Sequence, residues 1–344
     1  MASPYDDLLL APDERKEWPV ERVQIRHAHR GPGVWIQYLA LRAAQCVASL
    51  APWSVVQLAA GSLARLARIL DRRHTAAARD FVRTALPDLS PPEVERLVLG
   101  AWRHLIILAL EGQRAIPAVM GARLGEHYDV EVCEGLEELL ASGRGCLLIT
   151  AHVGNWEAMG PAIVAMGFGP CYAIGRVPRN DPLARHFQRA RERVGGILIP
   201  RSGAMQSVPK VLRAGGSVGM VLDHRARGKP IYVPFFGRLA ACDRSAAVLL
   251  RRISAPLVMV ACYDTKQRDR YRLVFSNILH PEDLTQLAST EIITRVNQEL
   301  EKLILAAPEQ YFWLHDRYKG APATSEPAES RPQETAVPTH EAPG

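Results

Sequence analysis

The chain has 344 residues, of which 48% are hydrophobic and 23% are charged, a composition that allows a sizeable core and excludes a chain disordered throughout. The formal net charge is +6, and the last 24 residues (four Glu, one Arg) contribute −3, so the remainder carries +9. A basic body predicts an anionic partner: a membrane surface, a nucleic acid or a phosphorylated ligand. Aromatic residues make up only 6% and do not alternate with basic ones, so we expect no nucleic acid partner.

Residues 1–30 are polar and charged without a signal-type apolar segment, so we expect a loosely ordered extension. Region 31–120 is helical by pattern and contains a run of 22 uncharged residues from Ala43 to Ala64, a length that would permit a membrane span. However, Pro52 interrupts the run, and its many Ala, Ser and Gln residues lower its apolarity. We therefore predict two amphipathic helices, with Pro52 in the first turn of the second.

Arginines flank these two helices, at positions Arg42, Arg65, Arg68, Arg72 and Arg73. Basic flanks on apolar helices favour a hairpin that lies in, or dips into, an anionic lipid leaflet. An ordinary core hairpin and a single membrane span are the alternatives. On this interpretation residues 31–120 form a membrane-associating region, and an anionic membrane surface is a partner.

A further helix is predicted to start at Ser90, because Glu93 follows at the capping-box spacing. From residue 129 strands and helices alternate. The expected strands are 129–133, 145–150, 171–174, 196–200, 217–223, 255–264 and 270–277. The expected helices are 135–142, 155–167, 181–195, 204–216, 245–254 and 289–308. This alternation predicts an α/β fold over residues 121–320, with a largely parallel, twisted sheet flanked by helices. The tail 321–344 is rich in Pro, Ala, Glu and Thr, and we expect it to be disordered.

The segment "ITAHVGNWEAMG" at 149–160 places His152 and Glu157 where a predicted strand meets a predicted helix. Ligands of open α/β sheets bind at the carboxyl ends of strands. From the first turns of the helix, Glu157 would reach back to the imidazole, fix its tautomer and raise the basicity of the other nitrogen. No serine or cysteine nucleophile accompanies the pair, so we expect His152 to activate an acceptor hydroxyl directly. Gly154 would permit close approach of the substrate, and N–H groups around it would stabilise the oxyanion.

Four segments resemble, in the same order, the characteristic blocks of bacterial lipid A biosynthesis (lauroyl/myristoyl) acyltransferases, within the lysophospholipid-acyltransferase-like superfamily. They are "RRHTAAARDFVRTALPDLSPPE" (72–93), "GCLLITAHVGNWEAMG" (145–160), "LRAGGSVGMVLDHRARGKPIYVPFFGRLA" (212–240) and "PEQYFWLHDRYK" (308–319). The second block contains an H-x4-E that is similar to the H-x4-D/E box of glycerolipid acyltransferases. The resemblance runs from about residue 33 to 320, and the relatives include phosphatidylinositol mannoside acyltransferases.

The resemblance implies that His152 is the general base and that Glu157 orients it. Gly154 and Asn155, which lie between the two, are assigned to substrate binding. No metal ligand is expected, because His152 and Glu157 lack a third ligand nearby in the sequence at a recognised spacing.

Three arginines and an aspartate are further substrate-binding candidates. Arg201 lies where the family carries an arginine-containing motif, which implies a phosphate anchor, and Arg176 is a similar candidate; a solvated loop arginine is the alternative. Asp223 ends a predicted strand and belongs to the rim of the site, or else caps a helix or turn. Arg317 is a phosphate ligand or a structural ion-pair partner.

The chain departs from the family at two places that bear on the substrate. It has "ACDRSAAV" at 241–248 where a Thr/Gly/Pro-containing run is usual, and His224 where glutamine is common. The acceptor is therefore left open between a lipid A precursor, a phosphatidylinositol mannoside and another glycolipid.

We predict an O-acyltransferase that moves a fatty acyl chain from acyl-carrier protein or acyl-CoA to an anionic glycolipid. It would act at the cytoplasmic face of the inner membrane, as a peripheral or monotopic protein. The donor is a substrate, so no cofactor is expected, and an acidic carrier protein would suit the basic surface. The alternative is a membrane-surface binding protein on the same scaffold without turnover. A dinucleotide site is excluded because the glycines of "RAGGSVGMVLD" precede a strand instead of following one.

Overall fold

The computed structural model describes residues 3–11, 31–169, 171–175, 179–193, 196–201, 203–226 and 228–322. Most of the predicted extension 1–30 and tail 321–344 lies outside the described residues. Residues 3–11, however, do not behave as a loose extension: Leu10 is fully buried, and its N–H donates to the carbonyl of Ala122 over 2.9 Å. The apolar side chains of this short segment attach it to the body of the protein.

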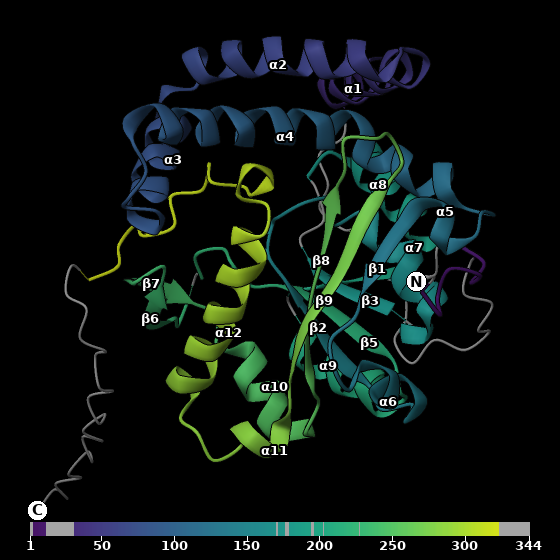
Figure 1. Ribbon diagram of the computed structural model, residues 1–344, viewed down its shortest axis with the longest axis vertical. Helices are drawn as coiled ribbons and strands as arrows, with labels where there is room; N and C mark the ends of the chain where they lie inside the picture. Colours follow the sequence, from purple (N-terminus) through teal and green to yellow (C-terminus); the bar gives the residue numbers. More distant parts are fainter. Residues whose placement is uncertain are drawn as a thin grey trace, which may run out of the picture.

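The helical region consists of α1 (Pro32–Leu50), α2 (Trp53–Leu70), α3 (Arg72–Ala85) and α4 (Pro91–Val119). The predicted break at Pro52 is confirmed, since this residue separates α1 from α2 as the N-cap of α2. The predicted capping box is also confirmed, because the Glu93 carboxylate accepts a hydrogen bond from the Ser90 N–H over 2.8 Å. Figure 1 shows α1 and α2 as an outer layer that covers α4. No helix in the described part of the chain has the length and apolarity needed to cross a bilayer.

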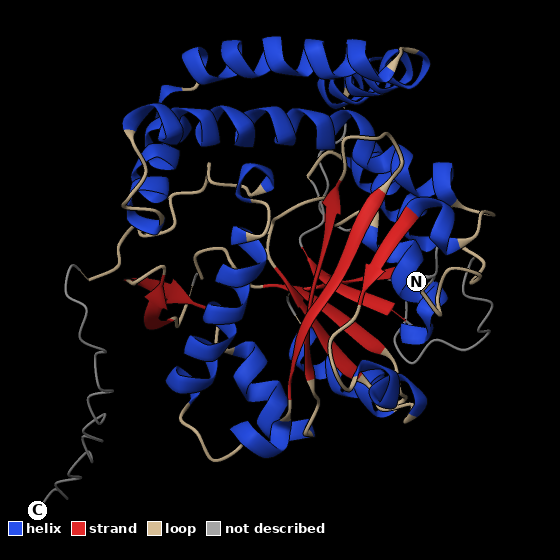
Figure 2. Ribbon diagram, viewed as in Figure 1, coloured by secondary structure: helices blue, strands red, loops and turns tan. Residues whose placement is uncertain are grey.

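The predicted largely parallel sheet is confirmed (Figure 2). Its strands are β1 (Tyr128–Glu131), β2 (Cys146–Thr150), β3 (Cys171–Gly175), β4 (Gly196–Pro200), β5 (Ser217–Val221), β8 (Leu257–Asp264) and β9 (Tyr271–Leu279). Within the described residues they form a seven-stranded sheet in the order β1-β9-β8-β2-β5-β3-β4. Only β8 and β9 pair in antiparallel fashion there. A separate antiparallel hairpin, β6 (Ile231–Phe235) and β7 (Arg238–Cys242), was not predicted from the sequence.

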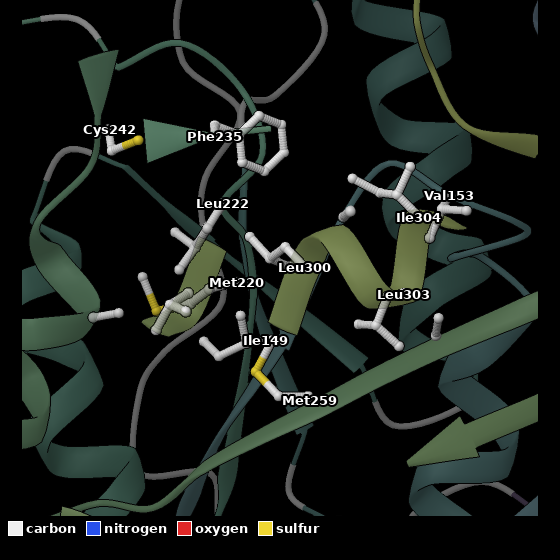
Figure 3. Close-up of a cluster of buried hydrophobic side chains, with 14 of the residues drawn as sticks. Ile149, Val153, Met220, Leu222, Phe235, Cys242, Met259, Leu300, Leu303 and Ile304 are labelled. Carbon is white, nitrogen blue, oxygen red and sulfur yellow. The ribbon is translucent and has the colours of Figure 1, made fainter. Parts of the chain in front are cut away.

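Helices cover the sheet on both faces, as the sequence predicts. The remaining helical segments of the described chain are α5 (Leu124–His127), α6 (Leu136–Ala141), α7 (Met159–Ile163), the π-helical η1 (Val164–Phe168), α8 (Asp181–Glu192), α9 (Ala204–Arg213), α10 (Ser245–Ile253), α11 (Pro281–Leu284), α12 (Ser289–Leu305) and the 3-10 turn η2 (Pro308–Gln310). Alternate side chains of β2 enter different clusters: Leu147 and Ile149 belong to one, Cys146 and Leu148 to the other. Figure 3 shows Ile149 in the same buried cluster as Leu300 of α12. A strand buried on both faces explains the uninterrupted apolar run that predicted β2.

Candidate active site

A buried carboxylate, that of Asp223, holds the His152 ring. The strands β2 and β5 are parallel neighbours with Thr150 paired to Val221, and each side chain follows its strand end by two residues. The Nδ1 atom of His152 donates a hydrogen bond to Oδ1 of Asp223 over 2.8 Å. Asp223 is fully buried. Burial raises the pKa of this carboxyl, but the charge of His152 and the hydrogen bond from its ring outweigh burial and hold the pKa well below its usual range.

The assignment of the orienting role to Glu157 is therefore corrected. The helix α7 begins only at Met159, so Glu157 lies in a turn and not in the first turns of a helix. Its carboxylate accepts two hydrogen bonds from Arg191 of α8, from Nε over 3.1 Å and from Nη2 over 2.5 Å. Both side chains line the same cavity as His152. Glu157 thus provides the counter-charge of Arg191, a residue that the sequence analysis did not single out.

The expected role of Gly154 and Asn155 is corrected as well. A Cβ atom at Gly154, where φ is +62°, would lie 2.0 Å from the carbonyl oxygen of Cys262, so the close approach is to β8 and not to a substrate. The N–H of Gly154 donates to the carbonyl of Gln310 over 3.1 Å, and the N–H of Asn155 donates to that of Cys262 over 2.6 Å. The Asn155 side chain is buried and accepts from the N–H of Ala158 over 3.1 Å. These two N–H groups bind protein carbonyls and are not free for an oxyanion.

A cavity of about 400 Å³ lies beside His152. One wall is mainly apolar and comes from β3, β4 and β5, through Ala173, Ile174, Leu198, Gly219, Met220 and Val221. Outside these strands the lining includes the polar His152, Glu157, Arg191, Arg201, His224, Arg225 and His315, together with the apolar Trp156 and Met159. A cavity with one apolar wall and several arginines suits a ligand that has an apolar chain and an anionic group.

The predicted phosphate anchors have different positions. Arg201 follows β4 and lines the cavity; its side chain is 48% exposed, and the carboxylate of Asp243 lies 4.0 Å away. Arg317 is 1% exposed and donates to a backbone carbonyl of β7 and to Sγ of Cys242, each over 2.9 Å. The prediction of Arg317 as a phosphate ligand is corrected, because its guanidinium is used to hold the β6–β7 hairpin. Arg176 lies outside the described residues.

Two histidines of the site were not assigned from the sequence, although both line the cavity: His224 and His315. His224 follows Asp223 at the same strand end, so its position at the carboxyl edge was a usable signal. His152, Asp223 and His224 bring ligand atoms within 4.8 Å of one another, a set that contains two residues distant in the sequence and does not include Glu157. A cation there would displace the hydrogen bond that already joins His152 to Asp223.

The hydrogen bond to Asp223 determines the chemistry of the His152 ring. A carboxylate only accepts, so Nδ1 carries the proton and the lone pair of the neutral ring is on Nε2. The ring can then take a proton from a hydroxyl group, and Asp223 stabilises the imidazolium that results. The site is therefore suited to general-base catalysis.

The chain is similar in sequence to known acyltransferases. The sequence model of a family described as "Bacterial lipid A biosynthesis acyltransferase" matches residues 23–320. The lipid A biosynthesis palmitoleoyltransferase of Escherichia coli K12 is 26% identical over 297 residues, which cover 85% of this chain and 93% of that protein. A phosphatidylinositol mannoside acyltransferase of Mycolicibacterium smegmatis is 28% identical over 152 residues, which cover 43% of this chain and 50% of that protein. A solved 1-acyl-sn-glycerophosphate acyltransferase of Thermotoga maritima aligns with 78% of this chain and 98% of its own at 13% identity, with a TM-score of only 0.29.

Proposed function

Since the chain belongs to the bacterial lipid A biosynthesis acyltransferase family and is an acyltransferase, we propose that it acylates a hydroxyl of an anionic glycolipid resembling a lipid A precursor. The donor is the thioester of acyl-carrier protein or of coenzyme A. The observation that carries this proposal is the hydrogen bond between His152 and the buried Asp223 beside a cavity with an apolar wall and three arginines. The proposed reaction needs no cofactor, because the donor thioester is a substrate.

In the proposed reaction His152 acts as the general base. Its Nε2 atom takes the proton of the acceptor hydroxyl while the oxygen attacks the thioester carbonyl. The tetrahedral intermediate collapses, the carbon–sulfur bond breaks, and the leaving thiolate receives the proton from the His152 imidazolium. Asp223 keeps Nδ1 protonated throughout and stabilises the transient positive charge. The products are an ester and a free thiol, and no acyl-enzyme is formed.

We assign the donor and the acceptor to different parts of the cavity lining. The apolar side chains from β3, β4 and β5 would accommodate the acyl chain. Arg201 and Arg225, which also line the cavity, would bind phosphate groups, and one Arg225 Nη already donates to the carbonyl of Lys319 over 3.1 Å. The basic body suits an acidic acyl-carrier protein as the donor's carrier.

The outer layer formed by α1 and α2 is the proposed membrane-binding surface, on the cytoplasmic face of the inner membrane. Its exposed apolar side chains are Trp35, Ile36, Leu39, Val47, Leu50, Val55, Leu58, Leu63, Leu66, Ile69 and Leu70. On α2, the buried Val56, Ala60 and Ala64 face the body at a spacing of four residues, while Leu58 and Leu66 are exposed to solvent. An apolar face this large is typical of a helix that lies in the lipid interface.

The proposal is tested by mass spectrometry of membrane lipids from cells that express the wild-type chain or His152→Ala. We expect a lipid that gains the mass of one acyl chain only with the wild type, which would identify the acceptor and the chain length together. A phosphatidylinositol mannoside as that lipid would replace the lipid A precursor in the proposal.

Two other outcomes of the lipid measurement would count against the proposal. Equal acylation by wild type and His152→Ala would contradict the role of His152. If neither protein acylates a lipid A precursor or a mannoside added to the membranes, with both folded and membrane-bound, the alternative of a non-catalytic lipid-binding protein would replace the proposal.

A further inference from the structure

Three imidazole rings form a column at the edge of the cavity. The rings of His152 and His224 are stacked, with centroids 3.8 Å apart and planes 13° from parallel. The rings of His224 and His315 follow, with centroids 4.4 Å apart and planes at 24°. His224 is thus the middle ring and covers one face of the proposed general base.

Two kinds of contact restrain the ring of His152: its hydrogen bond and the rings around it. The bond from Nδ1 to Asp223 restrains rotation about the Cβ–Cγ bond, but a hydrogen bond tolerates a range of angles, so the ring can still tilt within that range. A stacked ring restricts this tilt, because tilting would bring ring atoms into contact with the neighbour. Trp156 meets the same imidazole edge-on, with centroids 5.3 Å apart and planes at 83°. Asp223 and His224 are consecutive, so one strand end supplies both the hydrogen bond and the stacked face.

The hydrogen bonds of His224 do not explain its presence. Its Nε2 atom is buried and has no hydrogen-bond partner among the described residues. A buried polar atom without a partner carries a free-energy cost. Both faces of the ring, in contrast, stack against other imidazoles: His152 on one side and His315 on the other.

The neighbouring rings are neutral at the pH of the cell. Burial and the charges of His152, His315 and Arg317 lower the pKa of His224 to about 3, although Asp223 acts in the opposite direction. Burial and the charges of Arg317, Arg225 and His152 likewise lower the pKa of His315 to about 4, again against Asp223. Both rings therefore stay uncharged across the usual assay range, and neither competes with His152 for the proton of the acceptor.

We propose that His224, which this chain has where glutamine is common in the family, is a positioning residue of this chain: its ring limits the tilt of the His152 ring and hence the direction from which Nε2 meets the acceptor hydroxyl. This inference rests on the proposed function. Misplacing a reacting group by about 1 Å costs on the order of 10²-fold in rate. The role requires a flat ring at position 224 but not its nitrogen atoms.

The experiment compares His224→Ala, His224→Phe and His224→Gln in the purified full-length protein. The assay probes are palmitoleoyl-acyl-carrier protein and a lipid A precursor in detergent micelles. We expect His224→Ala and His224→Gln to lower kcat by about 10- to 100-fold with KM within about twofold, and His224→Phe to stay within about threefold of wild type. Exposed His280 supplies the control, since His280→Ala should leave kcat unchanged.

Either of two kinetic results would overturn the proposal. One is a folded His224→Ala protein with wild-type kcat; the other is a His224→Phe protein as slow as the alanine variant, which would show that a ring nitrogen is required. If His224→Ala does not fold, the pair Phe and Gln decides, because equal kcat values for the two contradict the role of the ring.

An NMR measurement separates this inference from the proposed function. Selective ¹⁵N-histidine labelling reports the Nδ1–H of His152 without any substrate. We expect its signal to be sharp in wild type and His224→Phe, and broadened or shifted in His224→Ala. Identical spectra for wild type and all variants would contradict the positioning role. If the wild type transfers no acyl chain but the spectra of the variants differ as expected, only the proposed reaction is contradicted.

Discussion

The hydrogen bond between Nδ1 of His152 and the carboxylate of Asp223 fixes which ring nitrogen can accept a proton. Asp223 has no solvent exposure, so water screens its charge less than it would screen that of a surface carboxylate. Glu157, five residues after the histidine, neutralises Arg191 instead. The acid that matters to the ring is therefore the one that is close in space, although it is 71 positions away in the sequence.

Asp223→Asn is expected to lower kcat by about 10²- to 10⁴-fold, because an amide side chain no longer holds the imidazole in the tautomer with Nε2 free. Rates of acyl transfer, measured with the palmitoleoyl donor and the lipid A precursor, check this expectation. Asp80→Asn is the control, since this exposed carboxylate lies on α3. A kcat for Asp223→Asn within threefold of that control would rule out the proposed role of the carboxylate.

At the scale of elements, one arginine joins the outer helices to the sheet. Arg268, in the turn between β8 and β9, donates to the carbonyls of Ala48 and Ala51 over 2.7 and 3.1 Å, at the C-terminal end of α1. It also donates to Glu111 of α4 over 2.6 and 3.1 Å, and its guanidinium lies 5.7 Å from the ring of Trp53 in α2. A cation at a helix C-terminus is favourable because the last carbonyls have no partner within the helix.

Arg268→Ala should lower the free energy of unfolding by about 2 kcal/mol, since it removes the charged donor of the last carbonyls of α1 and one of the two arginines, Arg268 and Arg114, that donate to Glu111. Urea denaturation gives this value, and limited proteolysis should show faster cleavage between α1 and α2. The matched control is Arg96→Ala on α4, whose side chain is 75% exposed and lies 3.4 Å from Glu93. We expect that control to change stability by less than about 0.5 kcal/mol. Equal stabilities of the two variants would refute the anchoring role.

At the scale of the whole molecule, apolar and basic surfaces lie on the same outer layer. The exposed apolar side chains of α1 and α2 are accompanied by the exposed Arg65 of α2 and by the exposed Arg72 and Arg73 in the first turn of α3, next to the end of α2. The apolar side chains would gain free energy by entering lipid, and the arginines by approaching anionic headgroups. Binding to a membrane is therefore expected to depend on both lipid charge and salt.

Leu58→Asp combined with Leu66→Asp should weaken binding to vesicles of phosphatidylethanolamine and phosphatidylglycerol at least 10-fold, because burying one leucine contributes about 1.5–3 kcal/mol. Vesicle flotation measures the bound fraction. Val132→Asp is the control, as this residue is 40% exposed but follows β1 and lies outside the helical layer. Undiminished flotation of the double variant would mean that α1 and α2 do not form the membrane-binding surface.

Local patterns in the sequence were sufficient to predict helix boundaries, because residues close in the sequence determine where a helix begins and ends. Pro52 marks the boundary of α2 because proline cannot continue the hydrogen bonds of a preceding helix, and Glu93 marks the start of α4 by bonding to Ser90. The hairpin β6–β7 was missed because its short strands lack a clear alternation. Gly154 was assigned to the substrate because its contact, the carbonyl of Cys262, comes from a distant strand.

The sequence by itself determined the fold class, the helical hairpin and the edge of the sheet that holds the site. Apolar runs and helical periods are local properties, and parallel strands place all their carboxyl ends on one edge. Only the tertiary structure decided which groups meet there. The pairing of β2 with β5 brings Asp223 and His224 to His152, while α8 brings Arg191 to Glu157. Strand order and helix placement depend on packing between distant segments, and no spacing within one segment reports them.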